Sequence, residues 1–491
     1  MRSLLGFTWL LLAACASMDP PVVALRGATV VDVTDGSLHA GQTVLIAGNR
    51  IAAVGPAARI RLPDNADVVE AAGGYVIPGL WDMHVHSVAN VALDTPIESV
   101  AARDWHFPLF LAHGVTGVRD MNDGTGDARL SLTTSIKRRL AAGDLIGPRL
   151  LAAGPSVDGD PNLGTNSVVV RTAAEARAVV DKLAESGADH VKPYENLTRD
   201  AYFAIIDQAR LRSLPVAGHV PFRVTPVEAA DAGQRTVEHL LALAAGCSTG
   251  AETERKRFAR VLLEYDTLPD IDRALALFRH ERALYDSRDP AACGATVAAY
   301  LRNGMAETPS LVGYHHFVNA REVLSDEASM RLVPPAIRRN WEAMLKSEDV
   351  RTAQSILEPI VPLQAANTRL LNDAGVVLLA ATDVGIPALV PGISLHQELA
   401  LLVDAGLTPL QALQAATLNP ARILGMADSL GTIEPGKLAD LVLLEANPLT
   451  NIGNTFRIRA VVADGRLYRR ADLDRLLAEA QALGEQVEKE Q

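Results

Sequence analysis

Two histidines lie one residue apart near the start of the central part of the chain. His84 and His86 occur in the segment DMHVH, where the apolar pattern predicts a buried strand. Because alternate side chains of a strand point to the same face, both imidazoles are expected to enter one space. A pair of this kind is equally compatible with a structural role. Further partners are needed before it predicts a metal site.

Four more polar side chains occur at or near the ends of other predicted strands: Lys192, His219, His239 and Asp383. In a parallel barrel the carboxyl ends of the strands converge on one face, where catalytic groups normally lie. Imidazoles, a carboxylate and a lysine gathered there are typical of a metal site. Each residue alone has a structural alternative. A histidine could be buried in the core with its hydrogen bonds made, Asp383 could cap a helix, and Lys192 could bury its aliphatic chain while its ammonium reaches the surface. Their joint placement favours metal binding.

These side chains require a frame of alternating strands and helices. Between residues 75 and 425, short apolar strands alternate with helical stretches such as Thr172–Ser186. This alternation predicts an α/β fold, a (β/α)8 TIM barrel. A doubly wound open sheet is the alternative, but its glycine-rich dinucleotide-binding turn does not follow the first strand. The predicted strands are Asp82–His86, Val115–Met121, Arg149–Gly154, Asp189–Tyr194, Pro215–Val220, Arg235–Leu240, Glu307–Leu311 and Val376–Asp383.

The barrel segment is flanked by β-rich sequence on both sides. Short strands separated by turns occupy residues 22–74 and recur at 426–470, which predicts a small β-sandwich domain built from both termini. The segment of about 246–304 is longer than one crossover helix needs, so we predict a helical insertion near the barrel mouth. Residues 471–491 are expected to form a charged helix or tail.

The composition restricts the classes of partner. Hydrophobic residues make up 48% and charged residues 21% of the 491 residues, so a large buried core is expected. The net charge is −12, and no basic run interleaved with aromatics occurs, which argues against a nucleic-acid partner. The sequence leaves association between copies of the chain open.

Residues 1–21 have the pattern of an export signal followed by a short linker. Arg2 precedes the apolar run Leu4–Leu12, which is too short to span a bilayer, and small residues precede Cys15. LAAC at 12–15 resembles the bacterial lipobox, whose cysteine is lipidated; a simple signal peptide is the alternative. We therefore expect an exported, periplasmic protein, anchored to the outer membrane only through a lipid on Cys15.

Two other cysteines, Cys247 and Cys293, flank the charged segment of the predicted insertion. In an oxidising periplasm they could form a disulfide that restrains this long excursion. Two unrelated small buried residues are the alternative, and the sequence does not decide between them.

Several short motifs extend the pattern beyond the six candidate ligands. They are VIPGL at 76–80, GHV at 218–220, EH at 238–239, ATD at 381–383, LTP at 407–409, AATLNPA at 415–421 and GTIEPGKLAD at 431–440. Together they resemble the amidohydrolase superfamily, and within it the branch of imidazolonepropionase-related and Xaa-Pro-dipeptidase-like enzymes. The resemblance covers nearly the whole mature chain.

The resemblance implies two bound divalent metal ions, with zinc as the expected species. The more buried ion would be held by His84, His86 and Asp383, and the more exposed one by His219 and His239.

Lys192 would bridge the two ions after reaction with CO2. A carbamate is an anionic ligand, whereas an ammonium cannot bind a cation, and burial near other cations frees the amine to react. An unmodified Lys192 is the alternative.

The implied reaction is hydrolysis of C–N bonds in small molecules such as dipeptides or N-acyl amino acids. Two ions about 3.5–4 Å apart can share a water and lower its pKa toward neutrality, which yields a bridging hydroxide. Asp383 would act as general base and then as general acid toward the leaving nitrogen. The alternatives are a lactone or ester hydrolase using the same site, and a ligand-binding lipoprotein that has lost catalysis.

Residues on the loops after the strands are expected to recognise the substrate. Tyr194 lies two residues past Lys192 and could hydrogen-bond a carboxylate or carbonyl of the substrate and assist the reaction. His315 follows the seventh strand and could reach the leaving group. Arg223 could meet an anionic end of the substrate. Packing at the barrel rim, or a surface position, is the alternative for these side chains.

Overall fold

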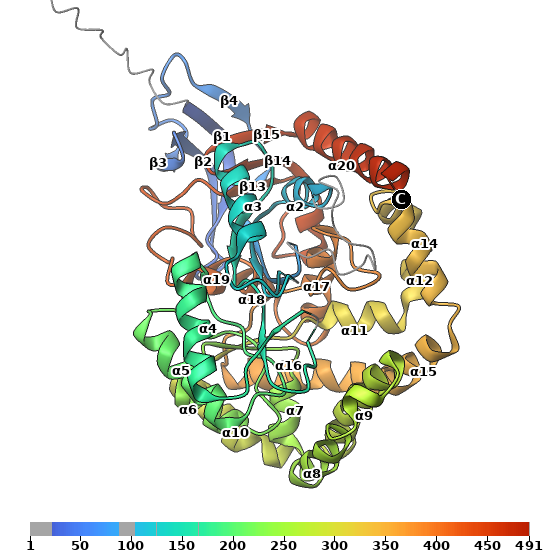
Figure 1. Cartoon of the computed structure of the whole chain (residues 1–491). Helices are drawn as coiled ribbons and strands as arrows, with labels where there is room; N and C mark the ends of the chain where they lie inside the picture. The colour runs from blue at the N-terminus through green and yellow to red at the C-terminus, as the bar shows by residue number, and fades with distance from the viewer. Residues whose placement is uncertain (1–21, 88–103, 124, 165, 491) are drawn as a thin grey trace, which may run out of the picture.

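The computed structural model describes residues 22–87, 104–123, 125–164 and 166–490. The predicted export segment, with Cys15, lies outside these residues. Figure 1 shows a sheet at one end of the molecule, built from the first and last strands of the chain, beside a body of strands surrounded by helices. None of the helices in the described ranges is long and apolar enough to cross a membrane.

Parallel strand pairings form a ring at the centre of the molecule. Strands β6 (Leu80–Val85), β7 (Val115–Asp120) and β8 (Arg149–Ala152) make one parallel sheet, and β11 (Thr236–Glu238) pairs in parallel with β12 (Ala306–Thr308). From β8 the ring continues through a hydrogen bond from the Asp189 N–H to the Ala152 backbone oxygen. Single parallel bridges link the rest of the ring: Val191 with Val216, Ala217 with Thr236, Glu307 with Leu378, and Val384 with Val85. Because Val85 belongs to β6, the last bridge closes the ring, and the (β/α)8 barrel is confirmed.

The first barrel strands are buried on both faces. Every residue of β6 and of β7 is buried, as expected for parallel strands that are covered by helices outside and side chains inside. Gly117 of β7 is needed at its position because a Cβ there would lie 2.2 Å from the indole of Trp81. The missing side chain at Gly117 therefore allows β6, which contains His84, to pack closely against β7.

The two termini form one continuous sheet of eight strands in the order β15-β14-β13-β5-β1-β2-β3, with β4 beside β1. We predicted a small β-sandwich built from both termini; the strands of both termini do lie together, and their hydrogen bonds connect them in one sheet. Strand β5, which we assigned to the barrel, belongs to this sheet because it pairs with β1 and β13. The strands are β1 (Val22–Val31), β2 (Leu38–Ala47), β3 (Arg50–Pro56), β4 (Asp67–Glu70), β5 (Tyr75–Pro78), β13 (Leu441–Leu444), β14 (Ile458–Ala463) and β15 (Arg466–Arg469).

Helices cover the barrel, and threonine caps begin several of them. The side chains of Thr172, Thr198, Thr225 and Thr408 each accept the backbone N–H three residues further on. Each cap of this type stabilises its helix by about 1 kcal/mol. The helices are α2 (Phe107–Ala112), α3 (Ser131–Ala142), α4 (Ala173–Ser186), α5 (Arg199–Leu211), α6 (Pro226–Ala232), α7 (Leu241–Cys247), α17 (Ile393–Asp404), α18 (Pro409–Ala415) and α19 (Leu418–Ile423); a short pair of strands, β9 (Val157–Asp158) and β10 (Val168–Val169), lies between α3 and α4.

Two helical excursions interrupt the barrel. The predicted insertion contains α8 (Ala251–Val261), α9 (Asp270–Asp286) and α10 (Gly294–Asn303). A disulfide between Cys247 and Cys293 joins the end of α7 to the start of α10 and so encloses α8 and α9. The second excursion follows β12 and was not predicted. It comprises α11 (Leu311–Val318), α12 (Ala320–Val323), α13 (Glu327–Met330), α14 (Pro335–Met344), α15 (Glu348–Leu357) and α16 (Val361–Ala374).

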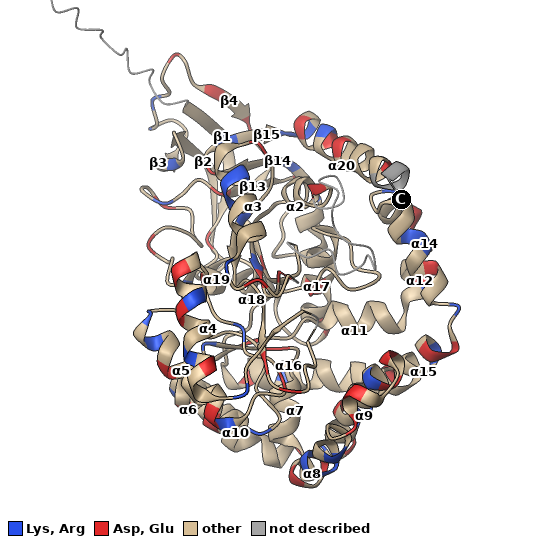
Figure 2. Cartoon of the chain, in the orientation of Figure 1, with Lys and Arg blue, Asp and Glu red and all other residues tan. Residues whose placement is uncertain are grey.

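The outer helices carry intermingled acidic and basic side chains (Figure 2). Arg199 of α5 pairs with Glu228 of α6 at 2.6 Å, and Arg212 after α5 pairs with Asp181 of α4 at 2.6 Å. The C-terminal helix α20 (Arg470–Glu490) is charged on its outer side, yet it buries Leu473 and packs against α2 and α14. Part of the surface charge thus links neighbouring helices.

Candidate active site

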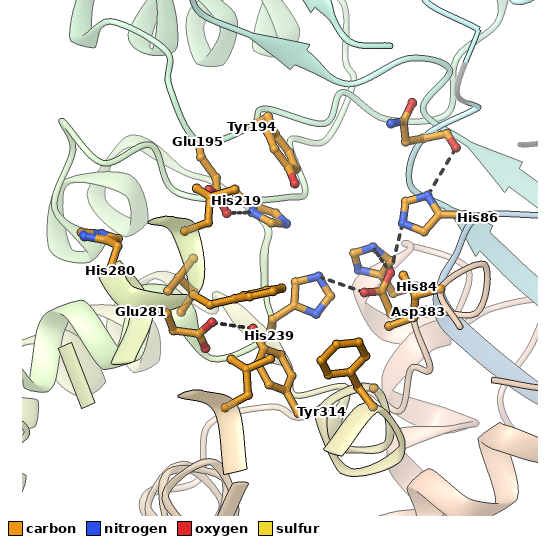
Figure 3. Close-up of a pocket in the computed structure, with 18 of the residues that line it drawn as sticks. His84, His86, Tyr194, Glu195, His219, His239, His280, Glu281, Tyr314 and Asp383 are labelled. Carbon is orange, nitrogen blue, oxygen red and sulfur yellow. Dashed lines mark hydrogen bonds and ion pairs between the residues drawn. The ribbon is translucent and has the colours of Figure 1, made fainter. Parts of the chain in front are cut away.

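The six candidate ligands lie together at the carboxyl ends of the barrel strands. All six line one cavity of about 410 Å³. Single side-chain atoms of His84, His239 and Asp383 lie within 4.8 Å of one another. The Lys192 Nζ lies 3.3 Å from His84 Nε2. The ring of His219 lies 5.3 Å from that of His239, centroid to centroid. Figure 3 shows the imidazoles and the Asp383 carboxylate directed toward a common centre.

Backbone strain marks two of these positions. His239 has φ +64° and Asp383 has φ +62°, in the left-handed region that non-glycine residues seldom adopt. Each lies just after a strand pairing, where the chain turns outward. Such conformations cost about 1–3 kcal/mol and concentrate at functional sites. The turns direct both side chains into the cavity.

Three of the imidazoles have Nδ1 engaged away from the cavity centre. His84 Nδ1 lies 3.0 Å from Glu238 Oε2, and His219 Nδ1 lies 2.8 Å from Glu195 Oε1. The His86 Nδ1 lies 3.4 Å from the backbone oxygen of Asn122. Carboxylates and carbonyls accept hydrogen bonds, so Nδ1 carries the proton in each ring. The Nε2 lone pairs then face the cavity.

This arrangement suits a cation. The Nε2 atoms of His84 and His86 lie 3.3 Å and 3.0 Å from the same oxygen of Asp383. With Nδ1 protonated, two lone pairs would face a carboxylate oxygen and repel it. A metal ion between them satisfies all three groups, and the outward hydrogen bonds are those that usually orient metal-binding imidazoles. The residues present fit a metal site.

The ionisation of the cluster agrees with this fit. Burial lowers the pKa of His219 to about 3 and that of His239 to about 4, so both rings are neutral and able to bind metal. Burial alone would raise the pKa of Asp383, but His239 and His86 bring it down to about 2. Burial also lowers the pKa of the Lys192 ammonium, although Asp383 opposes this. The neutral amine of Lys192, the form that reacts with CO2, is thereby favoured.

A buried network beneath the cluster holds the imidazole of His84 in place. Glu238 is 2% exposed and accepts hydrogen bonds from both His84 and Arg119, the latter at 3.0 Å from Oε1. Arg119 also donates 2.7 Å to the backbone oxygen of Met83. Thr236 donates to Glu238 at 2.7 Å. Glu238 thus holds the His84 imidazole, while Arg119 holds both Glu238 and the backbone just before His84.

The cavity has a polar floor and an apolar wall. The ligands form the floor, together with Tyr194, Glu195 and Asn122. The wall comes from the two helical excursions and nearby loops. It consists of Phe222, Leu241, Leu277, Phe278, Phe317, Leu357 and Ile386.

The predicted substrate-binding residues have different positions. Tyr194 lines the cavity, and its ring lies 4.6 Å from that of His219. Arg223 is directed elsewhere and donates to Asn196 Oδ1 at 2.6 Å. His315 is not among the lining residues, because α11 begins directly after β12 and turns the preceding residue, Tyr314, into the cavity. Arg223 and His315 therefore do not contact the space where a substrate would lie.

Sequence reasoning missed several residues of the site. Glu195 and Glu238 were not singled out for a role, although Glu195 follows Tyr194 and Glu238 precedes His239 in the sequence. Their functions depend on contacts with distant positions, such as Arg119. Glu281 and Tyr314 belong to the excursions, and no spacing in the sequence connects them with the strand ends. An acidic residue beside a predicted ligand was the only available signal.

The chain is similar to known proteins in both sequence and structure. The model of the "Amidohydrolase family" matches residues 75–468. Imidazolonepropionase of Geobacillus kaustophilus is 36% identical over 116 residues, which cover 21% of this chain and 27% of that protein. Adenine deaminase 3 of Rhizobium meliloti is 21% identical over 431 residues, which cover 86% of this chain and 55% of that protein. The matches thus span about a quarter and about half of these relatives.

A solved structure has the same fold. A Xaa-Pro dipeptidase, crystallised with methionine in its active site, aligns with a TM-score of 0.64 at 21% identity. The alignment covers 91% of this chain and 100% of the dipeptidase chain.

Proposed function

Since the chain belongs to the amidohydrolase family, we propose that it is a metal-dependent hydrolase of C–N bonds in small molecules such as dipeptides or N-acyl amino acids. The observation that carries the proposal is the convergence of neutral imidazoles, Asp383 and Lys192 on one centre in a cavity. The cavity is of the size that holds a small molecule.

The proposed cofactor is a pair of divalent ions, with zinc as the expected species. One ion would be held by His84, His86 and Asp383, and the other by His219 and His239. Lys192, as a carbamate, would bridge them. Ions bound there supply Lewis acidity, which polarises a carbonyl and acidifies a water molecule. The lowered pKa of Lys192 supports the carbamate.

In the proposed reaction Asp383 moves the proton. Its carboxylate is ionised at neutral pH and lies in the cavity beside His86 and His239. It would accept a proton from the attacking water and donate it to the leaving nitrogen. Tyr194, on the cavity floor, is positioned to hydrogen-bond the substrate. His219, held by Glu195, keeps its Nε2 toward the cavity.

The test combines metal content with turnover. Purified protein is analysed for metals, and hydrolysis of dipeptides and N-acyl amino acids is screened at a fixed metal load, with matched esters beside the amides. We expect about two ions per chain and turnover of amides. Less than one ion per chain, without turnover of any amide, would refute the proposal.

We also propose that the protein is exported and carries a lipid on Cys15. The lipobox-like sequence at 12–15 and the Cys247–Cys293 disulfide, a bond typical of oxidising compartments, support this. Expression of the full chain and of a Cys15→Ser variant in a bacterial host tests it. The full chain should partition with outer membranes and the variant should not. Equal distribution of both would contradict the lipid anchor.

A further inference from the structure

One carboxylate lies in the cavity wall, away from the metal ligands. Glu281 belongs to α9 of the insertion, is 5% exposed and lines the cavity. Its Oε2 accepts a hydrogen bond of 2.6 Å from the hydroxyl of Tyr314, which comes from the second excursion. Figure 3 shows the carboxylate directed toward Tyr314 and His239, whereas its neighbour His280 points away.

The other oxygen of this carboxylate has no partner. Oε1 of Glu281 is buried and makes no hydrogen bond within the described chain. A buried acceptor left in this condition costs about 1–3 kcal/mol, and more when it is charged. In a natural structure such a group needs an explanation, such as a water molecule, an ion or a ligand group that completes it. Glu281 therefore has an acceptor oxygen that a group of a bound ligand could pair with.

The surroundings indicate which charge the missing partner bears. Lys192 is the only lysine or arginine among the described residues that line the cavity, and it belongs to the ligand cluster. Glu195 lies on the same lining and adds a second carboxylate. Burial, aided by the negative charge of Glu195, raises the pKa of Glu281 to about 8. A cationic group nearby would stabilise its ionised form.

The neighbourhood of Glu281 also restricts the rest of the ligand. Leu277 and Phe278 precede it on α9 and line the cavity, and Phe317 lines it from α11. A molecule that places a cation against Glu281 would thus place aliphatic or aromatic carbons against these side chains. Burial of such groups adds about 25 cal/mol per Å² to binding.

We propose that Glu281 anchors a protonated amine of the substrate, so that this enzyme acts on amides that carry a free amine beside an apolar group. This inference rests on the proposed amide hydrolysis and defines its substrate class. It departs from our sequence-based expectation of N-acyl amino acids, whose amine is blocked and whose carboxylate would lack a basic partner in the described lining.

The kinetic test uses two matched substrates. L-leucine p-nitroanilide has a free amine, and N-acetyl-L-leucine p-nitroanilide does not. We expect the metal-loaded protein to prefer the free amine. In Glu281→Gln, kcat/KM for the free amine should fall about tenfold to a hundredfold, mainly through KM, since a charge-assisted hydrogen bond is lost. Turnover of the acetylated substrate should stay unchanged.

A control variant comes from the same insertion. Glu252→Gln removes an exposed carboxylate of α8 and should keep the wild-type preference. If Glu281→Gln keeps the preference for the free amine, or loses both substrates equally, the amine-anchoring role is wrong.

A binding measurement separates this inference from the hydrolytic activity. Calorimetry compares 3-methylbutylamine with 3-methylbutanol on metal-loaded wild type and on Glu281→Gln, after melting curves confirm that the variant is folded. Wild type should bind the amine at least tenfold more tightly than the alcohol, and the variant should lose this difference. Equal binding of both by wild type overturns the inference without any variant. If the amine binds through Glu281 but no amide is hydrolysed, the proposed function fails and the anchoring contact stands.

Discussion

Asp383 combines three properties that seldom occur together: a left-handed backbone, two imidazole contacts on one oxygen, and an ionised carboxylate inside a cavity. The backbone conformation limits which side chains the position accepts, because only glycine, asparagine and aspartate adopt it readily. The role of its charge can therefore be tested without disturbing the turn.

We predict that Asp383→Asn keeps the fold and part of the metal but loses most turnover. The amide fits the same backbone conformation and can bind a cation through its oxygen, but it cannot accept a proton from water. The loss in kcat should be about 10²–10⁴-fold. Thermal melts, metal analysis and kinetics on the best amide measure it. Asp270→Asn, at an exposed side chain, is the control, and near-wild-type turnover by Asp383→Asn would refute the proton-transfer role.

Glu238 is predicted to act through His84. Glu238→Gln removes the charge that pairs with the buried Arg119 and weakens the hold on the imidazole. Metal affinity, measured by competition with a chelator, should fall about 10–100-fold. Unfolding by urea should show a loss of about 3–5 kcal/mol. Unchanged metal affinity would mean that the network is structural only.

At this scale, prediction from sequence depended on the distance over which a residue acts. The six candidate ligands were identified because each lies at or near the end of a predicted strand, and the carboxyl ends of the strands in a barrel meet. Glu238 acquires its role from Arg119, which lies 119 positions away, so no local pattern reveals it. We proposed that His315 contacts the substrate, but its neighbour Tyr314 lines the cavity instead. The sequence did not indicate how the first turn of α11 is oriented.

Among the elements, the helical insertion has the largest influence on the site. Helix α9 supplies Leu277, Phe278 and Glu281 to the cavity, and the Cys247–Cys293 disulfide ties the ends of the segment that contains it. The two cysteines are 46 positions apart, so the bond closes a long loop.

We predict that a double variant, Cys247→Ser with Cys293→Ser, is less stable than the wild type. In the chain-entropy model a loop of this length contributes up to about 4 kcal/mol. The variant should unfold at lower urea concentration, and a reductant should shift wild type toward the variant while leaving the variant unchanged. Identical midpoints for oxidised wild type and the variant would show that the bond does not stabilise the fold.

Strands and insertions differed in how well the sequence revealed them. The predicted strands overlap the pairings in the ring, because fully buried parallel strands give continuous apolar runs. The insertion between α7 and β12 was visible by its length alone. The excursion from α11 to α16 was not, since its amphipathic helices resemble ordinary crossover helices in composition. The boundary at 74 was displaced because β5 pairs with strands from the other end of the chain.

For the whole molecule, the candidate metal site connects strands that are far apart in sequence. His84 lies in β6, the first strand of the ring, and Asp383 comes from its last part. An ion bound by both stabilises the folded chain, because a ligand that binds only the folded state adds RT ln(1 + [L]/Kd) to its stability.

We predict that removal of metal by a chelator abolishes turnover and lowers the melting temperature by several degrees. Added zinc should restore both. At a free ion concentration one hundred times Kd the gain is about 2.7 kcal/mol. Asp383→Asn, with a weakened ligand set, should show a smaller shift between the chelated and zinc-loaded forms. A melting curve that does not respond to chelator would contradict a bound ion in this protein.

The single bridge between Val85 and Val384 has a consequence for the timing of assembly. It closes the ring between strands that are 299 positions apart, and it holds the paired histidines next to Asp383. A nascent chain that contains His84 and His86 still lacks the last strand of the barrel. The full set of candidate ligands therefore comes together only after residue 384 has been made and the end of the ring has paired with β6.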